Sequence, residues 1–289
     1  MGNLLTGADT AAALTEQAKE RAQQLRQQGV VPTLAIVRVG EREDDLAYER
    51  GAAKRCAQAG VAVRSFALSQ EVTQQELLAL ISRLNADTAV HGVLLMRPLP
   101  LQLDDAAICR ALIPAKDVDG VTEGSMAGVY SGSQTGFAPC TAQACVALLK
   151  HNSIGLSGRR AVVIGRSLVI GKPVALLLLA ENMTVTVCHT KTENLSALCR
   201  EADVLVVAAG KAGLLGAESV RPGQVLLDVG IHVGADGKLC GDVRTADIEE
   251  IVRAVTPVPG GVGAVTTSVL ALHVVTAAER MSYKGGIVK

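Results

Sequence analysis

A glycine-containing turn in the middle of the chain has residue types suited to holding a phosphate group. Gly165 follows an unbroken apolar run, Gly171 precedes an apolar stretch of helical length, and Arg166 and Ser167 lie between them. Such a run is typical of a buried parallel strand, and a helix that begins just beyond it directs free N–H groups and its positive dipole end toward an anion. The spacing departs from the G-x-G-x-x-G dinucleotide fingerprint, because Ser167 takes the middle place and Gly171 comes one position late. The segment is therefore either a nucleotide site or an ordinary strand–helix turn.

The end of the next predicted strand carries no acidic residue. NAD-binding sheets usually place Asp or Glu there to hold the ribose 2′-hydroxyl, whereas here Cys188 is followed by His189, Thr190 and Lys191. Arg166 and Lys191 could instead neutralise a 2′-phosphate, which favours NADP over NAD as the cofactor. The alternative is that both are solvated surface cations.

A turn-forming segment nearer the N-terminus has residues that could bind a polar ligand. Lys116, Asp117 and Asp119 place one cation and two carboxylates within a few residues, between Pro114 and Gly120. Lysine donates hydrogen bonds and carboxylates accept them, so together they suit a ligand with both kinds of group. A solvated surface loop is the alternative.

Residues 256–263 are suited to contacting a ligand through the main chain. They contain two prolines and three glycines, so few bulky side chains are present. Glycine lets the backbone approach a flat ligand closely.

Alternating strands and helices are predicted to position these segments. Around the glycine turn, apolar runs predict strands at 161–165, 184–188, 203–210 and 224–230, with helical segments between them. In the first part of the chain, strands are predicted at 33–39, 61–68 and 90–96, with helices at 11–28, after 41, after 73 and at 104–112. This alternation predicts parallel β-α-β winding throughout.

The chain length favours two domains rather than one. We predict a first domain at 1–138, completed by a C-terminal helix within 266–289, and a second domain at 139–265. The Gly- and Ser-rich residues 124–136 predict a flexible connection, and a helix that opens at Pro139 is expected to link the domains.

Composition argues for a small-molecule partner. Lys plus Arg and Asp plus Glu both number 28, so no net charge attracts nucleic acid or an anionic membrane. The seven cysteines are scattered without a C-x-x-C pair, which favours reduced thiols in the cytoplasm, and without clustered histidines no metal site is expected. Neither an export signal nor an uninterrupted apolar run of about 18 residues is present, so no membrane span is expected.

Five strings taken together resemble the methylenetetrahydrofolate dehydrogenase/methenyltetrahydrofolate cyclohydrolase family. They are KDVDG at Lys116, GRSLVIGKP at Gly165, TVTVCH at Thr184, DVG at Asp228 and TPVPGGVG at Thr256. The resemblance implies an α/β fold with an N-terminal substrate domain, a Rossmann-type parallel-sheet NADP domain, a cleft between them and a homodimer formed through the Rossmann domains. Family members oxidise 5,10-methylenetetrahydrofolate by hydride transfer to NADP and then hydrolyse the methenyl product to 10-formyltetrahydrofolate, within one-carbon metabolism.

The resemblance also implies roles for single residues. Tyr48 matches the tyrosine that stacks on the folate rings and Asp119 the aspartate that anchors the pterin, while Pro259, Gly260 and Gly261 match the backbone wall of the pterin pocket. The residues that match the cofactor site are Gly165, Arg166, Ser167, Gly171, His189, Lys191, Thr141, which follows Cys140, and Ile231.

The departures from the family pattern cluster near Tyr48. The family places a catalytic lysine four residues after the tyrosine, where this chain has Ala52, and a glutamine where it has Met96. Asp45 replaces a serine. Lys54 is not a geometric substitute, because six residues rotate about 240° around a helix.

Hydride transfer depends mainly on positioning, whereas hydrolysis needs proton transfers for which Ala52 and Met96 offer no group. We therefore expect a dehydrogenase with weak or lost cyclohydrolase activity. Two alternatives are a divergent NAD(P) oxidoreductase with another substrate and a non-catalytic folate- or NADP-binding protein.

Overall fold

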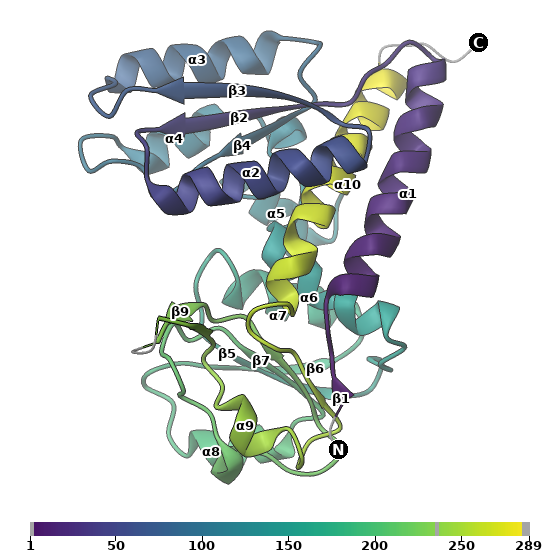
Figure 1. The fold of residues 1–289 in the computed structure, drawn as a ribbon, viewed down its shortest axis with the longest axis vertical. Helices are drawn as coiled ribbons and strands as arrows, with labels where there is room; N and C mark the ends of the chain where they lie inside the picture. Colours follow the sequence, from purple (N-terminus) through teal and green to yellow (C-terminus); the bar gives the residue numbers. More distant parts are fainter. Residues whose placement is uncertain (1–2, 235–236, 285–289) are drawn as a thin grey trace. The chain divides into compact units, whose positions relative to one another are not determined.

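The computed structural model describes residues 3–234 and 237–284, which form two compact units (Figure 1). The first, called here the three-stranded unit, contains Ala12–Cys140 and the chain from Thr267 onward. The second, the six-stranded unit, contains Thr141–Thr266 and the chain up to Ala11. The chain passes from one unit to the other within three helices, α1 (Ala8–Gln27), α6 (Cys140–His151) and α10 (Val262–Lys284).

A parallel sheet with the order β3-β2-β4 forms the centre of the three-stranded unit. Its strands are β2 (Thr33–Val39), β3 (Ala62–Leu68) and β4 (Gly92–Leu95), and the other elements are α2 (Glu43–Gln58), α3 (Gln74–Ala86), α4 (Asp105–Ala111), the 3₁₀ helix η1 (Pro114–Lys116) and α5 (Glu123–Ser131). The strands were predicted correctly to within two residues at each end.

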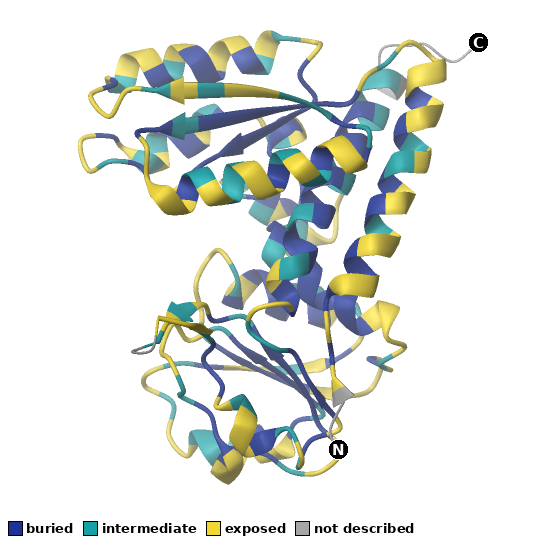
Figure 2. Ribbon diagram, viewed as in Figure 1, coloured by how far each residue is buried: buried dark blue, intermediate teal, exposed yellow. Residues whose placement is uncertain are grey.

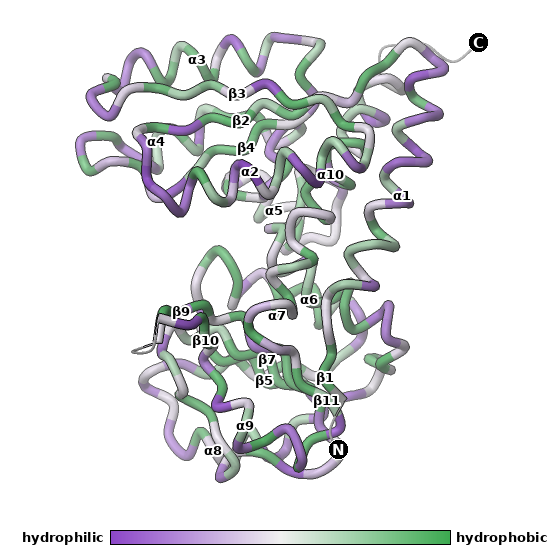
Figure 3. The backbone as a smooth tube through the Cα atoms, viewed as in Figure 1, coloured by the Kyte–Doolittle hydropathy of each residue, from purple (hydrophilic) through white to green (hydrophobic). Residues whose placement is uncertain are grey.

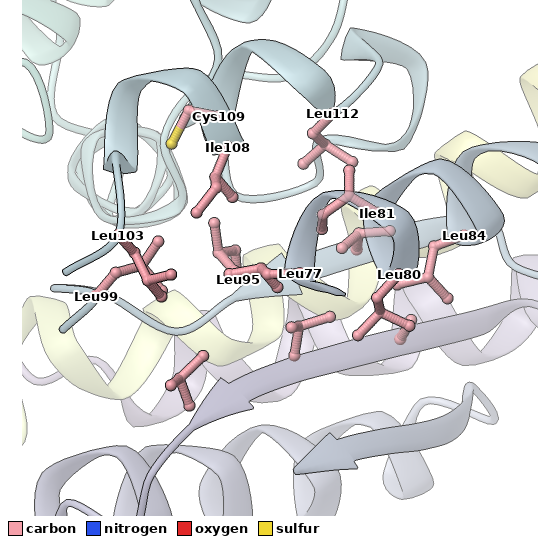
Figure 4. Close-up of a cluster of buried hydrophobic side chains, with 14 of the residues drawn as sticks. Leu77, Leu80, Ile81, Leu84, Leu95, Leu99, Leu103, Ile108, Cys109 and Leu112 are labelled. Carbon is pink, nitrogen blue, oxygen red and sulfur yellow. The ribbon is translucent and has the colours of Figure 1, made fainter. Parts of the chain in front are cut away.

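The core of this unit lies where α3 and α4 pack on the sheet (Figure 4). Helix α3 starts with a capping box between Thr73 and Glu76, each side chain accepting from the backbone N–H of the other residue. Its apolar residues recur at helical spacing and join those of β4, α4 and the loop between them: Leu77, Leu80, Ile81, Leu84, Leu95, Leu99, Leu103, Ile108, Cys109 and Leu112.

The prediction of a flexible connection at 124–136 is wrong, because α5 occupies Glu123–Ser131. Thr122 caps the helix by accepting from the Ser125 N–H, and Gly132 ends it in the left-handed conformation. Gly128 has no room for a side chain, since a Cβ there would meet the main chain of Thr135. The glycine at position 128 therefore allows α5 to pack closely against the main chain of Thr135.

The six-stranded unit contains a fully parallel sheet with the order β1-β11-β8-β7-β5-β6. The strands are β1 (Asn3–Leu4), β5 (Arg160–Ile164), β6 (Thr184–Cys188), β7 (Val204–Val207), β8 (Val225–Asp228) and β11 (Ala254–Val255). Helices α7 (Gly171–Ala180), α8 (Leu195–Glu201), η2 (Ala217–Ser219) and α9 (Thr245–Ile248) and the hairpin of β9 (His232–Val233) with β10 (Leu239–Cys240) complete it. Strands β5 and β7 are almost wholly buried and largely hydrophobic, as Figures 2 and 3 show. The fold is thus of the two-domain α/β class expected from the sequence.

The start of the chain differs from the predicted division, which assigned residues 1–138 to the first domain. Strand β1 pairs in parallel with β11, with Leu4 opposite Val255, so the chain begins in the six-stranded unit. Two residues are too few to show hydrophobic periodicity, so neither the strand nor its pairing could be predicted.

Helix α10 is long and apolar enough, by length and composition alone, to cross a membrane over Val262–Ser282. However, 61% of that window is buried inside the protein, as in a core helix of a folded domain. The buried polar groups of Thr266 and Ser268 also lie on it.

Candidate functional site

One face of α2 presents Tyr48, Ala52 and Cys56 at intervals of one helical turn. Ala52 and Cys56 are completely buried, whereas Tyr48 is partly exposed. Burial, followed by the negative charge of Asp119, raises the pKa of Tyr48 well above its ordinary value, so the phenol keeps its proton. The buried stripe of α2 therefore offers an aromatic ring and a neutral hydroxyl, but no amine.

Lys116, in the KDVDG segment, is buried and bonded internally. Its ammonium donates to the carbonyl oxygens of Leu84 (2.7 Å) and Asp87 (2.6 Å), at the end of α3. The alternative of a solvated surface loop is thus wrong for Lys116, which joins the segment to the unit's core.

Asp117 is also used internally and is fully buried. Its carboxylate accepts from the backbone N–H groups of Val121 (3.0 Å) and Thr122 (2.8 Å) and from the Ser125 hydroxyl (2.6 Å). Asp119 is then the one acid of the segment that stays partly exposed.

Asp119 lies in an environment that shifts its titration. Burial raises its pKa to about 6, and the charge of Asp117 adds to the rise, whereas hydrogen bonding from Cys140 and the charge of Arg97 oppose it. A carboxyl group whose pKa is shifted this close to neutral pH is a candidate for binding a ligand.

Arg97 directly follows the strand segment that contains Met96. Its Nε donates to Asp105 Oδ1 over 2.7 Å, and its Nη2 bonds Asp105 Oδ2, which fixes the guanidinium against α4. Arg97 is thereby held within electrostatic range of Asp119, and each alters the pKa of the other. Arg97 was not predicted as a site residue, because only the folded chain brings it toward Asp119.

The two positions that depart most from the family pattern are apolar and buried. Met96 is 5% exposed and donates its backbone N–H to Val37 (2.9 Å), which continues the pairing of β4 with β2. Ala52 is 0% exposed, whereas Lys54 is exposed on another face of α2, as the helical spacing predicts. Asp45 is buried in the first turn of α2, with Arg42 Nε 4.0 Å from its carboxylate.

Cys140 and His273 meet at the carbonyl of Val118, between the two aspartates of KDVDG. The carbonyl accepts from the Cys140 thiol (3.2 Å) and from His273 Nδ1 (2.8 Å), which assigns the Nδ1–H tautomer. Burial lowers the pKa of His273 to about 4, so the ring is neutral. These contacts fix the segment that carries Asp119.

The glycine turn follows β5 as predicted. Gly165 has a φ of +118°, and a Cβ there would collide with the Ala208 carbonyl. Ser167 Oγ accepts from the N–H groups of Ile170 (3.1 Å) and Gly171 (3.4 Å), at the start of α7. Gly171 is equally confined, since a Cβ there would meet the Gly165 carbonyl.

The predicted cations lie on the surface of the same unit. Arg166 and Lys191 are both exposed, and the Lys191 N–H donates to His189 Nδ1 over 3.2 Å. The His189 N–H in turn donates to the Thr192 hydroxyl (2.8 Å). The three residues directly after β6, His189 to Lys191, therefore include a cation and no acid, and the first acid of this turn is Glu193. A cation at this place fits a 2′-phosphate better than a 2′-hydroxyl.

The remaining predicted residues also lie in the six-stranded unit. Pro259 and Gly260 are exposed in the loop between β11 and α10, and Gly261 is buried beside them. Thr141 is partly exposed in the first turn of α6, and Ile231 is 62% exposed just after β8.

Asp242 was missed by the sequence analysis, although it organises the loops after β7 and β8. Its buried carboxylate accepts from the N–H groups of Ala209 (2.6 Å), Gly210 (3.0 Å) and Lys211 (2.9 Å) and lies 2.7 Å from His232 Nε2. No local pattern marks these contacts, since the three N–H donors lie 31 to 33 positions away from Asp242 and His232 lies 10 positions away. In the described ranges 3–234 and 237–284, no group of three or more His, Cys, Asp or Glu residues could hold a metal ion.

Comparison with protein families covers most of the chain. The model of the tetrahydrofolate dehydrogenase/cyclohydrolase catalytic domain matches residues 5–119, and that of the NAD(P)-binding domain matches residues 139–282. The chain is 49% identical over 282 residues to the bifunctional protein FolD of Carboxydothermus hydrogenoformans, covering 96% of this chain and 98% of that protein. It is 45% identical over 283 residues to the bifunctional protein FolD of Clostridioides difficile, covering 98% and 99%.

Solved structures show the same similarity. The bifunctional methylenetetrahydrofolate dehydrogenase/cyclohydrolase FolD of Campylobacter jejuni has a TM-score of 0.94 at 38% identity, covering 97% of this chain and 99% of that one. The Trypanosoma brucei enzyme, in complex with NADP cofactor and inhibitor, has a TM-score of 0.89 at 33% identity, covering 96% and 98%.

Proposed function

Since this chain belongs to the tetrahydrofolate dehydrogenase/cyclohydrolase family, we propose that it oxidises 5,10-methylenetetrahydrofolate to 5,10-methenyltetrahydrofolate with NADP as the hydride acceptor. The observation that carries this proposal is that Tyr48 lies within electrostatic range of Asp119. At the positions of the family's lysine and glutamine, the chain has the buried residues Ala52 and Met96. Groups that hold a folate are kept, and groups that move protons during hydrolysis are absent.

The folate is held by two side chains of the three-stranded unit. The ring of Tyr48 stacks on the flat heterocycle, and its neutral hydroxyl avoids a negative charge near the bound substrate. The ionised Asp119 carboxylate accepts hydrogen bonds from the amino and ring N–H groups of the pterin. To the main chain of Pro259, Gly260 and Gly261, in the six-stranded unit, we assign the pterin contact that the family resemblance implies.

The glycine turn and its neighbours hold the cofactor. Gly165 and Gly171 have no room for side chains, so the turn can fold tightly against the start of α7. The N–H groups at the start of that helix are then the groups that bind a phosphate. Arg166 and Lys191 neutralise the 2′-phosphate of NADP. The other residues that we assign to this site are Ser167, His189, Thr141 and Ile231.

Oxidation can proceed without the family's lysine. The methylene carbon loses a hydride with its electron pair to NADP, which leaves the methenyl cation and releases no proton. What the chain must supply is positioning, which Tyr48 and Asp119 provide.

We further propose that the second activity named for the relatives is weak here. Hydrolysis adds water to the methenyl carbon, releases a proton and opens a C–N bond, so it depends on groups that transfer protons. General acid–base help typically contributes about 10²- to 10⁴-fold, and neither Ala52 nor Met96 can give it.

The chain forms a cytoplasmic homodimer through its six-stranded units. The edge strand β6 carries Val187, which is 39% exposed, and α7 carries Leu179, which is 58% exposed. An unpaired edge with apolar neighbours favours association with a second copy. Light scattering should give a dimer mass that Val187→Lys reduces and the control Leu101→Lys, fully exposed in the other unit, does not.

A spectrophotometric assay tests the proposed activity. Purified protein mixed with 5,10-methylenetetrahydrofolate should form the methenyl product faster with NADP than with NAD. Calorimetric binding of folate and NADP without any absorbance change would instead indicate a non-catalytic binding protein. Activity with an unrelated hydroxy or amino substrate but none with the folate would indicate a divergent oxidoreductase.

A further inference from the structure

The N-terminal segment runs from the edge of the six-stranded sheet to the loop that carries Pro259, Gly260 and Gly261. After β1, the Leu5 N–H donates to the Val255 carbonyl and the Gly7 N–H donates to the Gly260 carbonyl, both over 2.8 Å. The Gly7 carbonyl accepts from the Ala11 N–H, also over 2.8 Å, where α1 begins. Gly7 therefore joins α1 to the loop through its N–H on one side and its carbonyl group on the other.

Gly7 approaches the loop too closely to carry a side chain. A Cβ at Gly7 would collide with the Gly261 carbonyl oxygen and would lie 2.9 Å from Val265 Cγ2 and 3.2 Å from Ala264 Cβ. Real Cβ atoms essentially never come within 3.0 Å of such neighbours, so the loop or the N-terminal segment would have to move. The backbone of Gly7 does not have a positive φ, so space rather than conformation requires glycine here.

The loop has fixed points on both sides of this contact. At its start, Thr256 is buried and its Oγ1 accepts from the Asp228 N–H over 2.7 Å. At its end, the Ala264 N–H donates to the Gly261 carbonyl (3.1 Å) as α10 begins. Residues 257–260 belong to no helix or strand. The hydrogen bond from the Gly7 N–H to the Gly260 carbonyl therefore contributes strongly to holding them in place.

We infer that residues 5–7 position the folate-contacting loop and that Gly7 is a positioning residue. Its N–H holds the Gly260 carbonyl, and the absence of a side chain lets the Gly261 carbonyl lie close to it. This inference rests on the proposed function, in which Gly260 and Gly261 contact the pterin. It adds the beginning of the chain to the parts that determine folate affinity, although residues 5–7 need not touch the substrate.

The variant Gly7→Ala tests the inference in the full-length protein. Because a displaced loop weakens its main-chain hydrogen bonds to the pterin, each worth up to about tenfold in affinity, KM for 5,10-methylenetetrahydrofolate should rise on the order of ten- to a hundredfold. KM for NADP should stay within about twofold, because Gly7 does not contact the glycine turn. Gly155→Ala is the matched control in the same unit, since a Cβ there meets nothing within 4 Å and its φ is ordinary.

The outcomes separate this inference from the proposed function. Absence of dehydrogenase activity in the wild type would contradict the proposed function itself. An active wild type with unchanged KM values in Gly7→Ala would overturn the inference alone, as would parallel increases in both KM values.

Hydrogen exchange on the wild type decides the matter if Gly7→Ala fails to fold. Addition of tetrahydrofolate should slow exchange of the Gly7 amide, which bonds Gly260, and leave that of Gly155 unchanged. Equal exchange of the Gly7 amide with and without bound tetrahydrofolate would overturn the inference.

Discussion

Ala52 lies one helical turn beyond Tyr48 on α2, with its methyl group completely buried at the position where the family has a catalytic lysine. Tyr48, next to it on the same face, stays partly exposed and interacts electrostatically with Asp119. In the proposed function the two positions therefore have different parts: Tyr48 is the group assigned to hold the folate, and Ala52 offers no group that could transfer a proton.

Restoring the amine should restore hydrolysis. Ala52→Lys combined with Met96→Gln is expected to raise the rate of methenyltetrahydrofolate hydrolysis by about 10²- to 10⁴-fold, the usual contribution of acid–base groups. The control Ala57→Lys adds the same charge at an exposed position of the same helix and should have no effect. If the double variant folds and binds folate but hydrolyses no faster, the loss of hydrolysis does not come from these two positions alone, and the departure at Asp45 is the next to test.

Asp119 should make folate binding depend on pH. Its pKa is raised to about 6, chiefly by burial, and only the ionised form offers acceptors at both oxygens to the pterin. KM for 5,10-methylenetetrahydrofolate is therefore expected to rise as the pH falls through about 6, while KM for NADP stays constant.

The variant Asp119→Asn checks this assignment. It should raise KM for the folate at neutral pH and remove the pH dependence, which steady-state kinetics would show. Because folding raises the pKa of Asp119 from 3.8 to about 6, the free energy of unfolding falls as the pH rises from about 4 to about 6, and the whole loss is present at neutral pH. The melting temperature of Asp119→Asn at neutral pH should consequently not fall below that of the wild type, and a large drop would indicate a structural role instead.

Arg97 should set the pH at which Asp119 binds folate. Its guanidinium, fixed by Asp105, favours the ionised carboxylate, so Arg97→Leu removes that support and raises the pKa of Asp119 further. The rise in KM for the folate should then occur at a higher pH, whereas Arg97→Lys should nearly preserve the wild-type profile. The control Arg110→Leu removes an exposed arginine of the same helix as Asp105. Identical pH profiles for the wild type and Arg97→Leu would refute this role.

The exposed cations Arg166 and Lys191 should determine the choice between NADP and NAD. A hydrogen bond to a charged group contributes about 1.5 to 3 kcal/mol, so Lys191→Ala should raise KM for NADP on the order of ten- to a hundredfold. KM for NAD should change little, because NAD has no 2′-phosphate. Equal effects on the two cofactors would show that Lys191 does not recognise that phosphate, and Arg166→Ala provides the parallel test.

Much of the fold could be predicted because its strands are buried on both faces. Continuous apolar runs such as those of β5 and β7 identify such strands, and the capping residues Thr73 and Glu76 mark the start of α3. The two-residue strand β1 and the Gly-rich helix α5 were not predicted, because the first is too short for periodicity and the second has weak helix formers.

The site was predictable only where a motif is local. The glycine turn and the KDVDG segment are contiguous, but their internal contacts are not visible in the sequence: Lys116 and Asp117 look as available as Asp119 until their partners in α3 and α5 are known. Arg97 and Asp242 act on residues far away in the chain, so no spacing rule could identify them.

The most direct test of the account follows both reactions in one sample of the wild-type protein. Excess 5,10-methylenetetrahydrofolate is added to purified protein with a limiting amount of NADP, and the methenyl absorbance is recorded until the cofactor is exhausted and for some time afterwards. The account predicts rapid formation of the methenyl product, followed by decay that is little or no faster than the decay measured in buffer without protein. Decay at a rate comparable with that of formation would contradict it, because the protein would then hydrolyse methenyltetrahydrofolate efficiently with Ala52 in place of the lysine.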